Sequence, residues 1–133
     1  DAHHSAEDIA IVLGEAFREA LGTRKGIERF ADCVVPMDET AALVAVDLSG
    51  RGYLSYDCPE LSDGKCGDFD TELVEEFLRA FCYRAGVNAY VKMLKGGNRH
   101  HQAEAVFKGL ARCMKKAAAV TSSRMPSSKG VLE

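Results

Sequence analysis

Two short segments of the sequence combine two imidazoles with one carboxylate at helical spacing. They are His3-His4-Ser5-Ala6-Glu7 and His100-His101-Gln102-Ala103-Glu104, which together hold all four histidines of the chain. Residues three and four apart share one face of a helix, so both histidines of each pair are expected to lean towards the following glutamate. Imidazole nitrogens and carboxylate oxygens suit Zn²⁺, Mn²⁺ and iron. We therefore predict metal ligation by His3, His4, Glu7, His100, His101 and Glu104.

The repetition of this motif sets it apart from a chance surface pair of histidines. The similarity continues at the same offset, because Leu13 matches Leu110 and Ala20 matches Ala117. Such a repeat predicts two related halves. Adjacent histidines diverge by about 100° around a helix, so we expect the two motifs to meet and hold two ions. A zincin-type hydrolase is disfavoured, because its two histidines stand four residues apart with the glutamate between them.

Periodic apolar residues predict the helices that carry these motifs. Helices are expected over residues 5–21, 73–85 and 99–119, with Thr71 as the N-cap of the second. A short helix or turn is expected at 27–30. The first helix is expected to bury the apolar stripe formed by Ile9, Leu13, Ala16, Phe17 and Ala20.

Strands are predicted between these helices. Residues 42–46 and 53–56 are expected to form consecutive strands around a turn at 49–52, and residues 87–94 form another strand. Residues 59–70 and the Ser-rich segment from Thr121 are expected to be loops. Strands that alternate with helices predict an α+β domain with the sheet and the helices in two layers.

Composition excludes several other classes of protein. The chain has 133 residues, 47% of them hydrophobic, which is enough for one core. A net charge of −3 and the absence of tryptophan disfavour nucleic-acid binding. The longest apolar run, 41–46, is too short to span a membrane. Five scattered cysteines favour free thiols in a reducing cytosol, so we predict a cytoplasmic location.

Cationic and hydroxyl side chains at turns are suited to binding an anion. They are Arg29, Arg51, Lys108, Ser127, Ser128 and Lys129. Together they could clamp a phosphate through charge-assisted hydrogen bonds. Asp38 and Glu39 supply further carboxylates, although a polar start of a strand explains this pair equally well.

Seven segments, in order along nearly the whole chain, resemble the imidazoleglycerol-phosphate dehydratase family. They are residues 1–8, 13–14, 26–30, 35–39, 47–51, 97–108 and 126–130, of which the two His-His-x-x-Glu segments are the most diagnostic. The resemblance implies dehydration of D-erythro-imidazole glycerol phosphate to imidazole acetol phosphate in histidine biosynthesis. It also implies two Mn²⁺ ions in each active site.

The resemblance further implies a fold of two-layer sheet/helix repeats, GHMP-kinase-like (ribosomal S5 domain 2-like), with the first repeat largely missing. Residues 1–31 would end the first repeat, 32–120 would form the second, and 121–133 would be a C-terminal substrate-binding tail. Active sites would lie at subunit interfaces of a homo-oligomer, a 24-mer of trimers. The implied substrate ligands are Arg29, Arg51, Lys108, Ser127 and Lys129. Glu104 or Glu7 is the candidate catalytic base.

The sequence departs from the family pattern in three places. A complete first repeat precedes the first motif in the family, so we expect this chain to be cut from a longer protein and to be inactive alone. Tyr90 stands where we expect a ligand histidine, and Ala2 replaces an aspartate. These departures leave open a degenerate, non-catalytic metal-binding protein. A small-molecule kinase of the same fold is disfavoured, because the chain has no Gly-rich phosphate loop.

Overall fold

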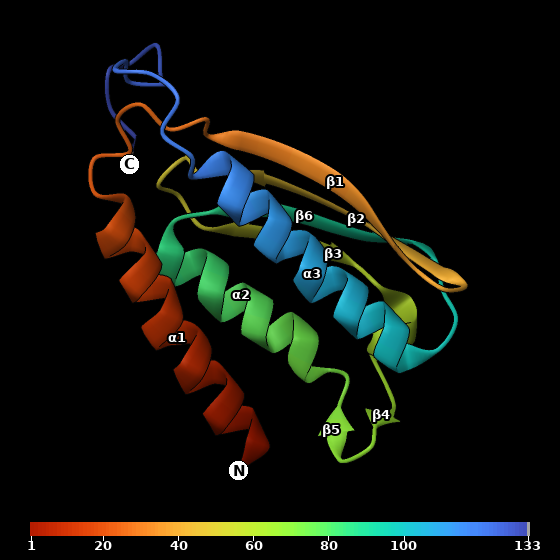
Figure 1. Cartoon of the computed structure of the whole chain (residues 1–133). Helices are drawn as coiled ribbons and strands as arrows, with labels where there is room; N and C mark the ends of the chain where they lie inside the picture. Colours follow the sequence, from red (N-terminus) through yellow and green to blue (C-terminus); the bar gives the residue numbers. More distant parts are fainter. Residues whose placement is uncertain (133) are drawn as a thin grey trace.

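A four-stranded sheet carries the helices on one of its faces in the computed structural model, which describes residues 1–132 (Figure 1). The strand order is β1-β2-β6-β3. Both β1 and β6 pair with β2 in an antiparallel sense, whereas β3 pairs with β6 in parallel. The α+β class predicted from the sequence is confirmed. The strand bounds are β1 (Phe30–Met37), β2 (Thr40–Asp47), β3 (Tyr53–Asp57) and β6 (Asn88–Lys95).

The prediction that residues 53–56 return beside residues 42–46 is wrong, because β6 lies between β2 and β3. Asn88 at the start of β6 is opposite Asp47 of β2 on one side and Tyr53 of β3 on the other. Parallel strands need a crossover connection, and α2 (Leu73–Ala85) supplies it between β3 and β6. The short turn at 49–52 therefore leads the chain away from β2 and leaves room for a later strand.

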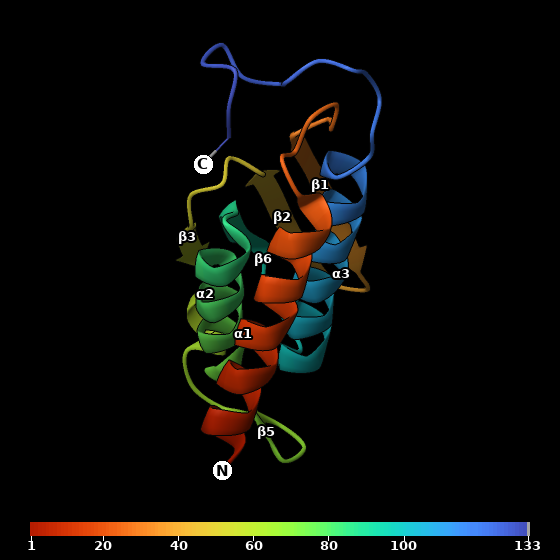
Figure 2. The ribbon, with the colours of Figure 1, turned by 90° about the vertical axis from the view of Figure 1, so that its left-hand side faces the viewer.

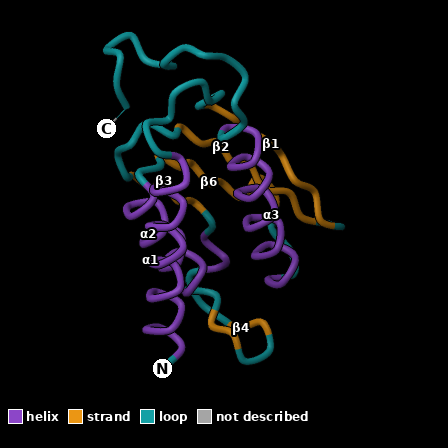
Figure 3. The backbone as a smooth tube through the Cα atoms, turned by 60° about the vertical axis from the view of Figure 1, so that its left-hand side comes forward, coloured by secondary structure: helices purple, strands orange, loops and turns teal. Residues whose placement is uncertain are grey.

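The helices lie in two tiers over the sheet. α3 (Arg99–Ala117) packs on β1 and β2, and α2 packs beside it over β3. α1 (Ala2–Leu21) packs on α2 and forms an outer tier, as the side view shows (Figure 2). The segment expected to be a loop contains a short helix, η1 (Pro59–Leu61), and a small hairpin of β4 (Lys65–Cys66) and β5 (Phe69–Asp70) below the main sheet (Figure 3). None of the helices within residues 1–132 is long and apolar enough to cross a membrane.

Three local expectations differ from the structure. α1 begins at Ala2, not at residue 5, because Asp1 caps it. Ile27 forms no helix and instead bridges to Val120, and β1 begins at Phe30. The Thr71 hydroxyl donates to the carbonyl of Gly64 at 3.2 Å and does not cap α2. In each case a partner distant in the sequence, or the last residue before the helix, decides the boundary.

The predicted buried stripe of α1 is correct for Phe17, which packs against the core beside Phe81, but wrong for most of its other members. Ile9 and Leu13 are 61% and 43% exposed, whereas Ala10 and Gly14 are buried against α2. A Cβ atom at Gly14 would lie 2.9 Å from the carbonyl oxygen of Phe81. Small side chains let the two helix backbones approach closely, so the contact forms on the Ala10–Gly14 face. Apolar periodicity marks a stripe but does not say which element covers it.

Another glycine sets the distance between α3 and the sheet. Gly109 is buried on α3, and a Cβ atom there would lie 2.6 Å from Cγ2 of Val44, a fully buried residue of β2. The neighbouring buried residues Val106 and Val91 fill the same layer between helix and sheet. Because packed interiors contain few voids, neither surface can retreat to admit a larger side chain.

We expect Gly109→Val to lower the free energy of unfolding by about 1–3 kcal/mol, because overpacking pushes α3 off β2. Ala111→Val is the matched control at an exposed position of the same helix, with an expected loss of about 0.5 kcal/mol from helix propensity alone. Chemical denaturation of both variants checks this. Equal losses in the two variants would contradict a close contact at Gly109.

Candidate functional site

Both His-His pairs occupy the first turn of a helix and are set by equivalent caps. The Asp1 carboxylate accepts a hydrogen bond from the backbone N–H of His4 at 2.8 Å. The Asn98 side chain accepts one from the backbone N–H of His101 at 3.1 Å. The internal repeat therefore extends to the capping residues, and each pair has the same place relative to its helix axis. We call the first turns of α1 and α3, with their glutamates, the α1 head and the α3 head.

The first histidine of each head pairs with the glutamate four residues later, as predicted. His3 Nε2 lies 3.6 Å from Glu7, and His100 Nε2 lies 3.0 Å from Glu104. The second histidine does not share that partner, so this part of the prediction is wrong. Nδ1 of His4 lies 3.2 Å from its own cap, Asp1. A rotation of about 100° between successive helix residues directs the second ring to another side.

The α1 head gains a carboxylate from another helix. Ligand atoms of His3, Glu7 and Glu76 all lie within 4.8 Å of one another, and within residues 1–132 no other trio of such residues is as close. Glu76 lies on α2 and was missed by the sequence analysis. Its local pattern is that of an ordinary polar residue on an amphipathic helix. Only the packing of α1 on α2 brings it to the histidine.

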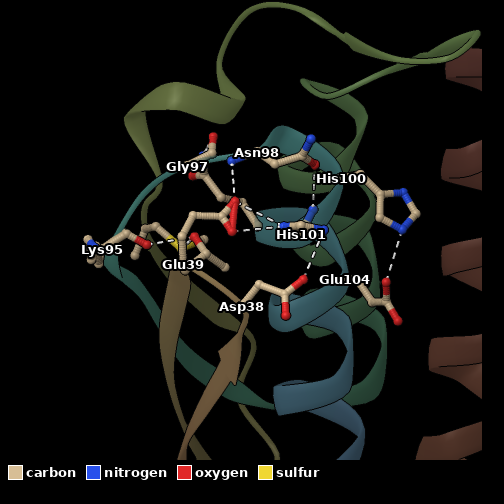
Figure 4. Close-up of polar contacts among 11 residues, drawn as sticks. Asp38, Glu39, Lys95, Gly97, Asn98, His100, His101 and Glu104 are labelled. Atoms are coloured by element: carbon tan, nitrogen blue, oxygen red, sulfur yellow. Dashed lines mark hydrogen bonds and ion pairs between the residues drawn. The ribbon is translucent and has the colours of Figure 1, made fainter.

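The α3 head gains its extra carboxylates from the turn between β1 and β2 (Figure 4). His101 Nδ1 lies 2.9 Å from both carboxylate oxygens of Glu39, and His101 Nε2 lies 3.6 Å from Asp38. Glu39 also accepts a hydrogen bond from the backbone N–H of Asn98 at 2.9 Å. From the sequence, this acidic pair could equally supply extra carboxylates or begin a strand, and the structure places it against His101.

The electrostatics of the α3 head keep its carboxylates ionised. The backbone N–H of Asn98, followed by the His101 side chain, lowers the pKa of Glu39 to about 2. The same carboxylate raises the pKa of His101. Lys108, whose Nζ lies 2.7 Å from Glu104, lowers the pKa of that carboxyl, and His100 adds to the effect. Glu39 and Glu104 are therefore anionic near neutral pH and carry the charge that a cation would need.

The two heads do not meet within one chain, so the predicted meeting of the two motifs would have to join different chains. α1 packs on α2 and hardly touches α3. The starts of α1 and α3 are separate in both ribbon views (Figures 1 and 2). The trio of His3, Glu7 and Glu76 includes no residue of the α3 head. Each head is thus an incomplete, open donor set in the isolated chain.

Four of the five predicted substrate ligands surround one cavity of about 160 Å³. The residues Arg29, Arg51, Ser127 and Lys129 line it together with Ser128, Val131 and Leu132. Arg29 is fixed by Asp47, with Nε and Nη2 donating at 2.7 and 3.3 Å, and its Nη1 donates to the carbonyl of Pro126 at 2.8 Å. The fifth, Lys108, lies instead on α3 beside Glu104. We call the cavity lined by Arg29, Arg51, Ser127 and Lys129 the cationic cavity.

The cationic cavity and the α1 head lie at opposite ends of α1. The helix has 20 residues, which corresponds to a length of about 30 Å. The head is its first turn, whereas Arg29 and the tail lie beyond its last turn (Figure 1). A ligand of the size of a sugar phosphate therefore cannot touch both from a single chain.

Tyr90 faces away from both heads. Its neighbours Ala89 and Val91 are buried beneath the helices, so alternation along β6 places Tyr90 on the opposite, open face of the sheet. The side chain is 53% exposed, and its ring lies 6.1 Å from that of Tyr53. Within one chain, Tyr90 therefore contributes to neither head, and its place at the position of an expected ligand histidine stays a prediction.

Comparisons with known proteins agree with these features. A family model described as imidazoleglycerol-phosphate dehydratase matches residues 1–114. The chain is 54% identical over 133 residues to the imidazoleglycerol-phosphate dehydratase of Desulforudis audaxviator, which covers 99% of this chain and 67% of that relative. It is 52% identical over 134 residues to the enzyme of Carboxydothermus hydrogenoformans, with 99% and 68% covered.

Solved structures of the same kind superpose well. The enzyme of Staphylococcus aureus matches with a TM-score of 0.85 at 45% identity, over 92% of this chain and 70% of that one. The enzyme of Pyrococcus furiosus, solved in complex with (S)-C348, has the same score at 39% identity, over 98% and 71%. The chain spans about two thirds of the length of its curated relatives. From the matched motifs, the shared fold and this level of identity, the chain belongs to the imidazoleglycerol-phosphate dehydratases, a family of hydro-lyases of histidine biosynthesis.

Proposed function

We propose that this protein dehydrates D-erythro-imidazole glycerol phosphate to imidazole acetol phosphate. The observation that carries the proposal is the pairing of two His-Glu heads with a separate cationic cavity. The substrate has matching ends, an imidazole ring that suits the metal-binding heads and a phosphate that suits the cavity. The relatives from Desulforudis and Carboxydothermus carry the name of this activity. A cytoplasmic location forms part of the proposal, because all five cysteines are free thiols.

The donor set of the two heads fits Mn²⁺. Its ligands would be His3, His4, Glu7, His100, His101 and Glu104, with Glu76 completing the trio at the α1 head. All are imidazole nitrogens or carboxylate oxygens, and the side chains of His3, Glu7 and His100 are between 42% and 67% exposed, which leaves coordination positions open. Two bound Mn²⁺ ions would supply Lewis-acid stabilisation of the negative charge that develops on the substrate.

The chain's own carboxylates would move the proton. The reaction removes a proton from a carbon next to the imidazole ring, and hydroxide leaves the neighbouring carbon. Glu104 is the first candidate for the base, because Lys108 keeps it ionised and positioned. Glu7 is the second candidate, from the equivalent position of the α1 head. The cationic cavity would hold the phosphate and so orient the reacting carbons.

An assembly of several copies would complete the site. One chain keeps its two heads apart and places the cationic cavity beyond the far end of α1. The open face of the sheet also exposes large apolar side chains, namely Phe30, Val34, Tyr53, Tyr90 and Leu94. Such a surface is typical of an interface. We propose a homo-oligomer, a 24-mer of trimers, in which heads and cavities of different subunits face each other.

The central test is metal content and turnover of the natural full-length protein. We expect His101→Ala to lower bound Mn²⁺ and activity together, because a ligand is lost. Glu104→Gln is expected to lower kcat at least about 100-fold, because the amide cannot accept the proton. Glu19→Gln, on the exposed side of α1, is the control with normal activity. Metal mass spectrometry and a steady-state assay measure these effects.

A near-normal kcat in Glu104→Gln would exclude Glu104 as the catalytic base. A wild type that binds Mn²⁺ without turnover would favour the non-catalytic alternative.

The cationic cavity is tested separately. We expect Arg51→Ala and Lys129→Ala to raise KM about 10- to 100-fold each, since a hydrogen bond to a charged group contributes about 1.5–3 kcal/mol. Binding of the unphosphorylated imidazole glycerol should be weak and unchanged by either substitution. Steady-state kinetics measures KM for the substrate, and isothermal titration calorimetry measures the affinity for the unphosphorylated compound. Equal losses for the two compounds would show that the cavity does not hold the phosphate.

A further inference from the structure

Glu39 connects two elements that are distant in the sequence. It follows Asp38 at the tip of the β1–β2 hairpin, and its carboxylate reaches the α3 head (Figure 4). Both oxygens lie 2.9 Å from His101 Nδ1, and one of them accepts from the backbone N–H of Asn98 at 2.9 Å. The Glu39 carboxylate thus contacts only Nδ1 of His101, whereas Nε2 lies 3.6 Å from Asp38, beyond hydrogen-bond distance.

The turn before α3 and the tip of the β1–β2 hairpin pack closely around the Glu39 side chain. A Cβ atom at Gly97 would lie 2.5 Å from Glu39 Cγ, so only glycine admits the side chain at this distance. The fully buried Gln102 donates from Nε2 to the carbonyl of Gly97 at 2.9 Å and holds that turn. The Thr40 hydroxyl donates to the carbonyl of Lys95 at 2.7 Å and fastens the hairpin to the end of β6. Several independent contacts therefore fix Glu39 against His101.

The internal repeat indicates that the contact between Glu39 and His101 has a function. In the α1 head, Nδ1 of His4 pairs with a carboxylate that its own cap, Asp1, supplies. The cap of the α3 head is Asn98, an amide, and there the carboxylate comes from Glu39. The second histidine of each head thus has a carboxylate on Nδ1 although the two carboxylates have different origins. The His101 side chain is 29% exposed and that of His4 is 77% exposed, so the α3 head is the more enclosed.

We propose that Glu39 is a positioning residue that holds the His101 ring with its proton on Nδ1 and presents the Nε2 lone pair to a divalent cation. The proposal rests on the proposed function, in which His101 ligates Mn²⁺. A carboxylate that accepts the N–H of a ligating imidazole fixes its tautomer and orientation and makes the other nitrogen a better ligand, and its loss costs about 10- to 100-fold in metal affinity. Glu39 itself touches neither the ion nor the substrate.

The test compares Mn²⁺ binding by the full-length wild type, Glu39→Ala, Glu39→Gln and Gly97→Ala. We expect Glu39→Ala to weaken binding about 10- to 100-fold at the one site that His101 serves. Glu39→Gln should lose less, because its amide oxygen still accepts the Nδ1 proton. Gly97→Ala should weaken binding as well, because the added methyl displaces Glu39 without removing its charge. Glu19→Gln should bind like the wild type. Titrations followed by the electron paramagnetic resonance of free Mn²⁺ measure all of these.

The outcomes separate this inference from the proposed function. Circular dichroism and melting temperature first establish that each variant is folded, and Gly97→Ala serves if Glu39→Ala is not. Wild-type Mn²⁺ affinity in folded Glu39→Ala, or in folded Gly97→Ala in its place, alongside weakened affinity in His101→Ala, overturns the role of Glu39 alone. Wild-type affinity in His101→Ala as well overturns the ligand assignment on which it rests. A lower melting temperature with unchanged affinity shows that Glu39 is merely structural.

Discussion

The angle between successive residues of an α-helix constrains both His-Glu heads. Two adjacent histidines diverge by about 100°, and in both heads they take different carboxylates. The first histidine of each pair takes the glutamate four residues later. The second must find its partner elsewhere, at the helix cap in the case of His4 and at the β1–β2 hairpin in the case of His101. This divergence gives the two rings of each head different carboxylate partners, which fits the proposed pair of ions.

The same constraint makes the fold part of the site. The hairpin reaches the α3 head because α3 packs on β1 and β2, and that packing depends on the close approach of Gly109 to Val44. Glu76 reaches the α1 head because Ala10 and Gly14 let α1 lie close to α2. Small residues far from the chemistry thus set the positions of the carboxylates. Each head receives its extra acidic group from the neighbouring element on which its helix rests.

The length of α1 keeps the α1 head far from the cationic cavity within a single chain. The head at its start and the cationic cavity beyond its end are about 30 Å apart along the helix axis. The two tiers of helices also keep the heads of α1 and α3 apart. In the proposed homo-oligomer, symmetry would bring the start of one subunit's α1 to the tail of another, so that a ring and a phosphate of one small molecule could be held together.

The sequence by itself determined the helices, the motif with its i, i+4 His-Glu pairs, and four of the residues around the cationic cavity, because helical spacing and turn chemistry are local. The order of the seven matching segments along the chain indicated the family. Only the tertiary structure decided that β6 lies between β2 and β3, that α1 packs through Ala10 and Gly14, and that Glu76 and Glu39 join the heads. These depend on contacts between residues far apart in the chain, which no local periodicity encodes.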